Sequence, residues 1–110
     1  MYKYRAEYLS NYDGDTIKFR VDLGFKIRFD ITVRLEGINT YELRSADTEL
    51  KERGYVAKYR VKELLESAEE IIIETEKGRK GKYGRYLATV YYDGTNLNQQ
   101  LMDEGLAEAY

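Results

Sequence analysis

The sequence predicts a mainly β domain with helices, an α+β fold in which five strands close into a small barrel. Two observations carry this prediction. Much of the N-terminal third alternates strictly between apolar and polar residues, which is typical of half-buried strands. A stretch with helical spacing then separates these strands from two later ones. A flatter α+β sheet is the alternative, but coiling closes the edges of a sheet that contains one very long strand.

Alternation is strict in the second and third of the five expected strands. The expected strands cover residues 4–9, 16–23, 25–35, 70–76 and 86–92. In the second strand, Ile17 and Phe19 share one face, and the odd positions after Gly24 repeat the pattern. The second and third strands are therefore expected to pair in antiparallel fashion across a tight turn that contains Gly24. We expect the five strands to run as a meander.

Two helices are expected outside the barrel. The longer one spans about residues 52–69, where apolar residues recur at helical spacing. The shorter one begins near Asn96, a favourable N-cap residue, and ends at Gly105. Three strands, a helix and two more strands fit a barrel of the oligonucleotide-binding type. At 110 residues, the chain is expected to form one domain, residues 1–110.

Composition limits the chemistry. The chain has no His and no Cys, which excludes Ser-His dyads, Cys nucleophiles and thiolate zinc sites. The net charge is −2, yet one glycine-rich stretch is strongly basic and contains Lys77, Arg79, Lys80, Lys82 and Arg85. The first residues lack the apolar run of a signal peptide or membrane span, so we expect no membrane insertion and favour a cytoplasmic protein, with a secreted mature form left open.

Three short clusters supply the groups that phosphodiester cleavage needs. They are residues 13–16 (Asp-Gly-Asp-Thr), residues 34–42 and residues 82–85 (Lys-Tyr-Gly-Arg). Asp15 shares the inward phase of Ile17, so its carboxylate is expected at the barrel rim beside a cation. Arg34 lies at a position of the third expected strand that faces outward. Taken alone, the first cluster is typical of a loop with an Asx turn, and Arg34 of a solvated surface residue.

In this order and spacing, the three clusters resemble the staphylococcal nuclease (thermonuclease) family, and residues 98–107 resemble that family's helix after the barrel. The resemblance covers nearly the whole chain. It implies a Ca²⁺-dependent nuclease on an oligonucleotide-binding barrel, which cuts DNA and RNA with little sequence specificity and leaves 3′-phosphates.

The resemblance also implies metal ligands. Asp15 corresponds to the metal-binding aspartate, and Thr40 to the threonine whose backbone carbonyl binds the metal. Asn39 stands where a second aspartate ligand is usual, which removes one negative charge and predicts weak binding. A site with only oxygen ligands favours Ca²⁺, with Mg²⁺ second, over Zn²⁺ or Cu²⁺.

The remaining motif positions imply catalytic and substrate-binding roles. Glu42 corresponds to the glutamate that acts on the attacking water, and without His a carboxylate must do this work. Arg34 and Arg85 correspond to the two arginines that hold the phosphate, for which bidentate guanidinium groups are well suited. Substrate contacts are expected from Lys82, Tyr83 and Tyr110.

Two functions remain in competition at this point. Retention of Glu42, Arg34 and Arg85 favours an active nuclease that acts on DNA or RNA as a monomer or weak dimer. Asn39 favours the alternative, a weak or inactive module of the same fold that binds nucleic acid or a protein partner.

Overall fold

The computed structural model describes residues 2–75 and 85–110. Lys82 and Tyr83 therefore lie outside the described residues. The elements, in chain order, are β1 (Tyr2–Asn11), β2 (Thr16–Asp22), β3 (Arg28–Leu35), β4 (Ile38–Thr40), α1 (Thr48–Glu66), β5 (Ile71–Thr75), β6 (Tyr86–Tyr92), β7 (Thr95–Asn96), α2 (Leu97–Asp103) and β8 (Ala107–Ala109).

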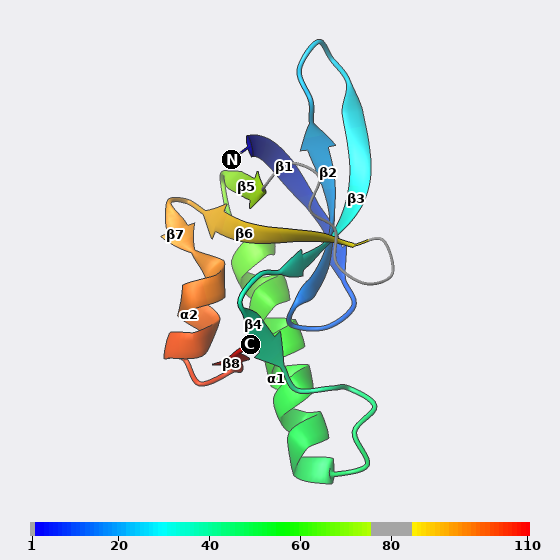
Figure 1. Ribbon diagram of the computed structural model, residues 1–110, viewed down its shortest axis with the longest axis vertical. Helices are drawn as coiled ribbons and strands as arrows, with labels where there is room; N and C mark the ends of the chain where they lie inside the picture. Colours follow the sequence, from blue (N-terminus) through cyan, green and yellow to red (C-terminus); the bar gives the residue numbers. More distant parts are fainter. Residues whose placement is uncertain (1, 76–84) are drawn as a thin grey trace.

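Five strands close into a barrel, which confirms the predicted fold class (Figure 1). The strand order is β3-β2-β1-β5-β6, and a parallel pairing of β3 with β6, from Val33 opposite Tyr86 to Leu35 opposite Ala88, completes the circle. The expected plain meander is wrong for the last two strands. The chain crosses through α1 from β3 to the far side of β1, where β5 pairs in antiparallel fashion.

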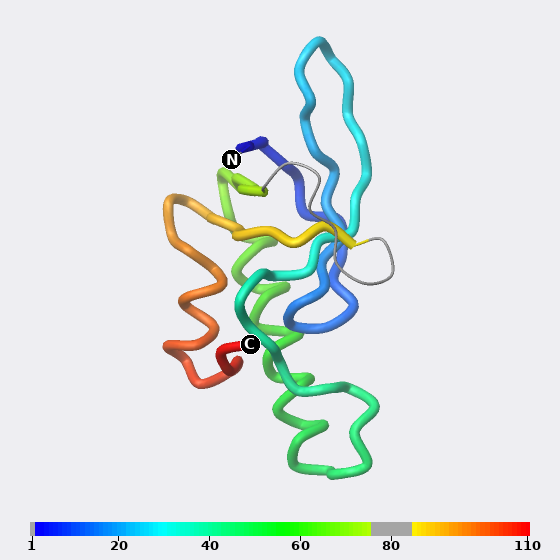
Figure 2. The backbone as a smooth tube through the Cα atoms, in the orientation of Figure 1, coloured from blue at the N-terminus to red at the C-terminus, as the bar shows by residue number. Residues whose placement is uncertain are grey.

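The β2–β3 hairpin differs from the prediction at its tip. The third strand begins at Arg28 rather than at residue 25, because Phe25 and Lys26 adopt left-handed backbone conformations with φ of 54° and 64°. The tube drawing shows this hairpin as a narrow ribbon that projects beyond the barrel, while the start of α1 projects in the opposite direction (Figure 2).

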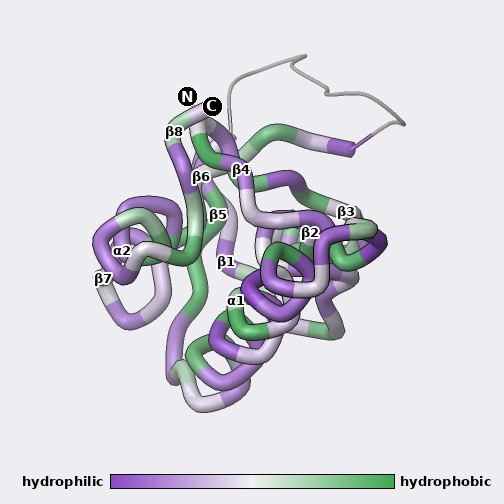
Figure 3. The backbone as a smooth tube through the Cα atoms, turned by 90° about the horizontal axis from the view of Figure 1, so that it is seen from below, coloured by the Kyte–Doolittle hydropathy of each residue, from purple (hydrophilic) through white to green (hydrophobic). Residues whose placement is uncertain are grey.

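One apolar core holds the barrel and the helices together. The strands contribute alternate side chains, which bury Ile17 and Phe19 completely, and α1 contributes Val61 and Leu65. Figure 3 shows hydrophobic and hydrophilic segments alternating along α1, as expected for a helix with one apolar face. Other members of the core are Val33, Leu35, Ile38, Ile73, Val90, Leu97 and Leu101.

Side-chain caps set where the helices begin. Asp47 accepts hydrogen bonds from the backbone N–H groups of Glu49 and Leu50, so α1 starts at Thr48, four residues before the predicted boundary. Asn96 caps α2 as predicted, through a bond from Gln99. The chain then turns at Gly105, whose φ is +74°, and enters β8.

The short strands β4 and β8 form a separate two-stranded sheet that the sequence pattern does not predict, because strands of three residues are too short to show alternation. Asn39 pairs with Glu108 in this sheet, and Tyr110 donates its backbone N–H to the carbonyl of Gly37 at 3.0 Å. The C-terminal residues thereby fix the loop that follows β3. Within residues 2–75 and 85–110, no helix combines the length and the apolar character needed to cross a membrane.

Candidate active site

The loop between β1 and β2 presents two carboxyl groups at the barrel rim. Asp13 Oδ1 accepts hydrogen bonds from the backbone N–H groups of Asp15 (3.1 Å) and Thr16 (2.8 Å), which is the Asx turn expected from the sequence. Gly14 lets this loop lie close to its neighbours, because a Cβ atom there would be 2.8 Å from both Ala57 Cβ and Thr40 Cγ2. The loop is therefore pressed against α1 and β4.

Asp15 is buried at this rim and is 6% exposed. Its Oδ2 accepts the backbone N–H of Thr40 at 3.0 Å and lies 3.6 Å from Nη2 of Arg34. Its Oδ1 accepts the hydroxyl of Thr16 at 3.3 Å. A buried carboxylate needs such partners, and here β2, β3 and β4 each supply one.

Arg34 does not point into solvent, although its Cα lies on the outward phase of β3. Its Nη1 donates to the carbonyls of Leu35 and Ile38, both at 3.2 Å, and its Nη2 donates to Asn39 Oδ1 at 2.5 Å. The guanidinium also lies 5.0 Å from the centre of the Tyr110 ring. The interpretation of Arg34 as a solvated surface residue is wrong, because the long side chain folds back over the β3–β4 turn.

Arg85 approaches Asp15 from the other side. Its Nη1 donates to the Thr16 hydroxyl at 3.2 Å, and that hydroxyl donates in turn to Asp15 Oδ1. The two arginines that the sequence singles out therefore flank one carboxylate, Arg34 directly and Arg85 through Thr16. The sequence reasoning assigned no separate role to Thr16, and only its place in the Asp-Gly-Asp-Thr cluster could have indicated one.

The second carboxyl group, Asp13, has an unusual proton affinity. Burial, together with the neighbouring Asp15 carboxyl group, raises the pKa of Asp13 to about 7. Close by, the buried hydroxyl of Thr40 is the one buried side-chain polar atom of the described residues that has no hydrogen-bond partner. The Asp15 carboxylate and the unpaired Thr40 hydroxyl are oxygen donors of the kind that a hard cation takes.

This donor set carries little charge. Among the described residues, no group of three or more acidic side chains converges to hold a metal ion. Asn39 adds an amide oxygen, which is engaged by Arg34. The residues present thus fit Ca²⁺ by donor type, while their low charge corresponds to a weak site.

Glu42 lies beside this group of residues. It lines a small hollow of about 220 Å³ together with Asn39, Thr40 and Glu108. It is exposed, and its carboxylate makes no hydrogen bond or ion pair with the part of the chain that the structure describes. Glu108, by contrast, accepts a hydrogen bond from the Tyr41 hydroxyl at 3.1 Å. Glu42 therefore offers an unoccupied carboxylate at the edge of the site.

The structure brings together most of the predicted site residues. Four of them, Asp15, Arg34, Asn39 and Thr40, are linked by direct hydrogen bonds or an ion pair. Arg85 joins through Thr16, Tyr110 lies against Arg34, and Glu42 shares a hollow with two members. Lys82 and Tyr83 are outside the described residues, so the structure does not place them.

Comparison with known proteins finds one matching family and several similar proteins. The model of the staphylococcal nuclease homologue family matches residues 32–110. The SPbeta prophage-derived endonuclease YokF of Bacillus subtilis (strain 168) is 41% identical over 96 residues, which cover 86% of this chain and 30% of that protein. Endonuclease YncB of the same strain is 40% identical over 96 residues, covering 86% of this chain and 43% of that protein.

A thermonuclease of Staphylococcus intermedius is 35% identical over 97 residues, covering 88% of this chain and 54% of that protein. The chain thus spans between about a third and a little over half of these relatives' lengths. The family match, the closed barrel and the ordered motifs agree, and this chain belongs to the staphylococcal nuclease family.

Proposed function

We propose that this domain is a Ca²⁺-dependent nuclease that hydrolyses phosphodiester bonds in DNA, and in RNA, with little sequence preference. Its family and the endonuclease names of its relatives support a nuclease. The observation that carries the proposal at the level of residues is the position of Asp15 between two guanidinium groups, with Arg34 at 3.6 Å and Arg85 joined through Thr16.

In this proposal Asp15, Asn39 and Thr40 hold the cation. When bound, Ca²⁺ supplies positive charge that offsets the charge of the phosphate and helps to orient it. Asn39 Oδ1 is engaged by Arg34, so binding requires this amide to exchange one partner for another. Because the site has few charges, we expect Ca²⁺ to be needed at roughly millimolar concentration, toward the weak end of calcium sites.

The chain's own residues perform the remaining steps. Glu42 accepts a proton from a water molecule whose oxygen attacks phosphorus. The bond from phosphorus to the 5′-oxygen breaks, and this oxygen takes a proton from solvent water, which leaves a 3′-phosphate and a 5′-hydroxyl. The exposed Glu42 carboxylate is free to take up this role. Arg34 and Arg85 donate hydrogen bonds to the phosphate oxygens and stabilise the charge that grows on them. Tyr110, which lies against Arg34, borders the same surface and is available to stack on a base.

The test is cleavage of single-stranded DNA and of RNA by the purified protein in Ca²⁺, Mg²⁺ or chelator. Glu42→Gln should lower the rate in Ca²⁺ by about 10² to 10⁴, the usual range for loss of a general base. Glu108→Gln is the matched control, because Glu108 lines the same hollow but is already engaged by Tyr41, and it should stay within about threefold of wild type. Equal losses in the two variants would remove Glu42 from its assigned role.

One observation favours a second function. The neutral Asn39, bonded to Arg34, lowers the charge available to a cation, which suits a module that binds nucleic acid without cutting it. Absence of cleavage under every metal condition, together with retained binding of a labelled oligonucleotide, would establish this alternative.

A further inference from the structure

The β2–β3 hairpin carries large apolar side chains that remain exposed in the part of the chain that the structure describes. At the base of the hairpin, one face of the ribbon packs in the barrel core, where Phe19 and Val21 are buried. Val21 pairs with Phe29, and the apolar alternation continues past this pair toward the tip. The end of the hairpin projects beyond the barrel (Figure 1). The large apolar side chains exposed there are Leu23 (46%), Ile27 (55%), Phe29 (55%) and Phe25 (98%).

The turn at the tip of the hairpin is unfavourable for the residues that form it. Ile27 donates its backbone N–H to the carbonyl of Gly24 at 2.9 Å, so Phe25 and Lys26 are the two central residues of a tight turn. Both have positive φ, a geometry for which Asn-Gly is strongly preferred in two-residue hairpins. Phe25 therefore adopts a strained backbone conformation while its aromatic ring is exposed to water. This combination indicates a binding role.

The charge of the hairpin is opposite to that of the protein. Residues 18–30 contain four basic and two acidic residues and have a net charge of +2, whereas the whole chain has a net charge of −2. Both acidic groups are engaged, since Asp30 binds Arg20 and Asp22 accepts the N–H of Gly24 at 2.8 Å. Lys26 and Arg28 form no ion pair with any other described residue. An exposed aromatic ring beside unpaired cations matches a nucleic acid, whose bases stack and whose phosphates are anionic.

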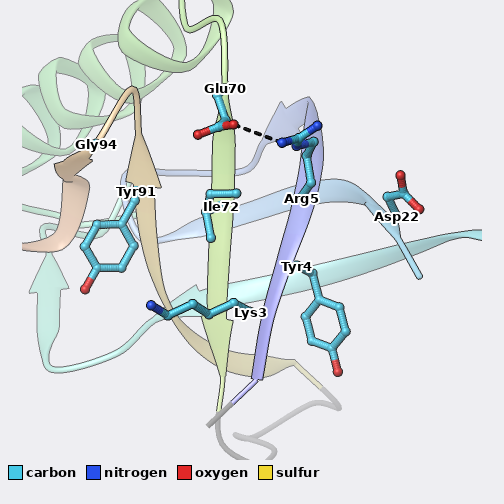
Figure 4. Close-up of a pocket in the computed structure, with 8 residues that line it drawn as sticks. All are labelled: Lys3, Tyr4, Arg5, Asp22, Glu70, Ile72, Tyr91 and Gly94. Carbon is cyan, nitrogen blue, oxygen red and sulfur yellow. Dashed lines mark hydrogen bonds and ion pairs between the residues drawn. The ribbon is translucent and has the colours of Figure 1, made fainter. Parts of the chain in front are cut away.

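A hollow connects the hairpin to the candidate active site. It measures about 520 Å³, and its wall includes Thr16 and Arg85 at one end and Phe29 on the hairpin. Tyr12 and Tyr86 add aromatic rings along it. A second hollow of about 730 Å³ lies over β1, β5 and β6, where Arg5 and Glu70 neutralise each other at 3.1 Å (Figure 4). No residue of the candidate site lines that second hollow, whereas Thr16 and Arg85 of the site line the first.

We propose that the β2–β3 hairpin is an arm that binds a single strand of DNA or RNA beyond the cleavage point. The strand runs from Arg85 along the hollow past Phe29, Phe25 stacks on a base, and Lys26 contacts a phosphate at the tip. At about 3.3 Å per residue, the tip lies roughly 26 Å along the ribbon from Thr16. At about 3.4 Å per stacked nucleotide, this distance corresponds to roughly eight nucleotides.

The proposal rests on the proposed function, and its test separates the two. The arm variant combines Phe25→Asn with Lys26→Gly, which gives the turn its preferred residues and is expected to fold at least as stably as wild type. Steady-state cleavage in Ca²⁺ is compared on a 20-nucleotide strand and on a dinucleotide. The ratio of kcat/KM between the long and the short substrate should fall about fivefold or more, the lower limit for loss of one stacked base. Tyr59→Ala, an exposed aromatic change on α1, should leave this ratio within twofold of wild type.

Binding is measured separately, by fluorescence anisotropy of labelled strands of 4 to 20 nucleotides in chelator. This assay tests the arm even if wild type cleaves nothing, a result that would refute the nuclease proposal alone. We expect the arm variant to bind strands longer than about eight nucleotides more weakly than wild type does, with no difference on the shortest strands. Equal affinities on the long strands would overturn the proposal. The proposal would also be overturned if the arm variant lost binding to phosphatidylserine vesicles while its binding to oligonucleotides was unchanged. That result would assign the tip to a lipid surface.

Discussion

Replacing Asn98 with Ala should destabilise the protein more than any ordinary polar change on its surface. Asn98 is 5% exposed and lies in the first turn of α2. Its Oδ1 accepts the backbone N–H of Val90 at 3.1 Å, and its Nδ2 donates to the carbonyls of Glu36 (2.9 Å) and Ala88 (3.2 Å). One side chain therefore joins α2 to β6 and to the turn that leads from β3 into the candidate site.

The size of the effect follows from these three bonds. Each contributes about 1 kcal/mol, and a buried N–H group left without a partner costs about 1 to 3 kcal/mol more. We expect Asn98→Ala to lower the free energy of unfolding by about 4 to 6 kcal/mol. With an unfolding entropy of about 2.1 cal/mol/K per residue, Tm should fall by about 17 to 26 °C.

The assay is urea unfolding followed by circular dichroism, with a thermal scan beside it. Gln99→Ala is the matched control, because the Gln99 side chain is exposed and its one hydrogen bond to a described residue is to Asp103 in the same helix. It should change stability by less than about 1 kcal/mol, as surface changes usually do. A loss below about 1 kcal/mol for Asn98→Ala, with an unchanged m-value, would refute the view that this side chain clamps the turn.

Three further changes test other contacts. Thr16→Val removes the hydroxyl that joins Arg85 to Asp15. It should lower kcat/KM in Ca²⁺ by about tenfold and lower the free energy of unfolding by about 1 kcal/mol. An unchanged rate would show that the bridge does not position the guanidinium. Asn39→Asp should tighten Ca²⁺ binding in a calorimetric titration, and an unchanged affinity would mean that position 39 is not a ligand. The hydrogen bonds from Arg60 hold the pKa of Glu104 below its ordinary value of 4.5, so their contribution to stability is present above that pH and is lost as the pH falls through the lower, folded-state value. Glu104→Gln should therefore have a lower free energy of unfolding than wild type at pH 7, and this difference should disappear in acid. A difference that does not depend on pH would contradict this linkage.

The sequence predicted the local elements of the fold better than their arrangement. Alternation identified β2 and β3 because a side-chain period of two depends only on neighbouring residues. It could not predict that β3 pairs in parallel with β6, since that pairing joins residues far apart in the chain. The apolar phase continues through Phe25 and Ile27 and so predicts strand at the tip of the hairpin, whereas the backbone turns at Phe25 and Lys26.

The sequence likewise predicted some features of the candidate site and not others. The inward phase of β2 predicted that Asp15 lies at the rim, and its carboxylate is buried there. Alternation correctly predicts that the Cα of Arg34 faces outward from β3. It does not predict the position of the guanidinium, because a long side chain can reach carbonyl groups around the next turn. The bridge through Thr16 depends on which groups the closed barrel brings within 3.5 Å, and spacing along the sequence carries no such information.

The central claim is that Asp15 anchors a Ca²⁺-dependent cleavage site. It is tested most directly by the initial rate of cleavage of a labelled single-stranded oligonucleotide as a function of Ca²⁺ concentration, for wild type and for Asp15→Asn. We expect the wild-type rate to be zero in chelator and to rise through the millimolar range, and the Asp15→Asn rate to be at least about 10²-fold lower at the same Ca²⁺ concentration. Cleavage by wild type that persists in chelator, or equal rates for the two proteins, would contradict the claim.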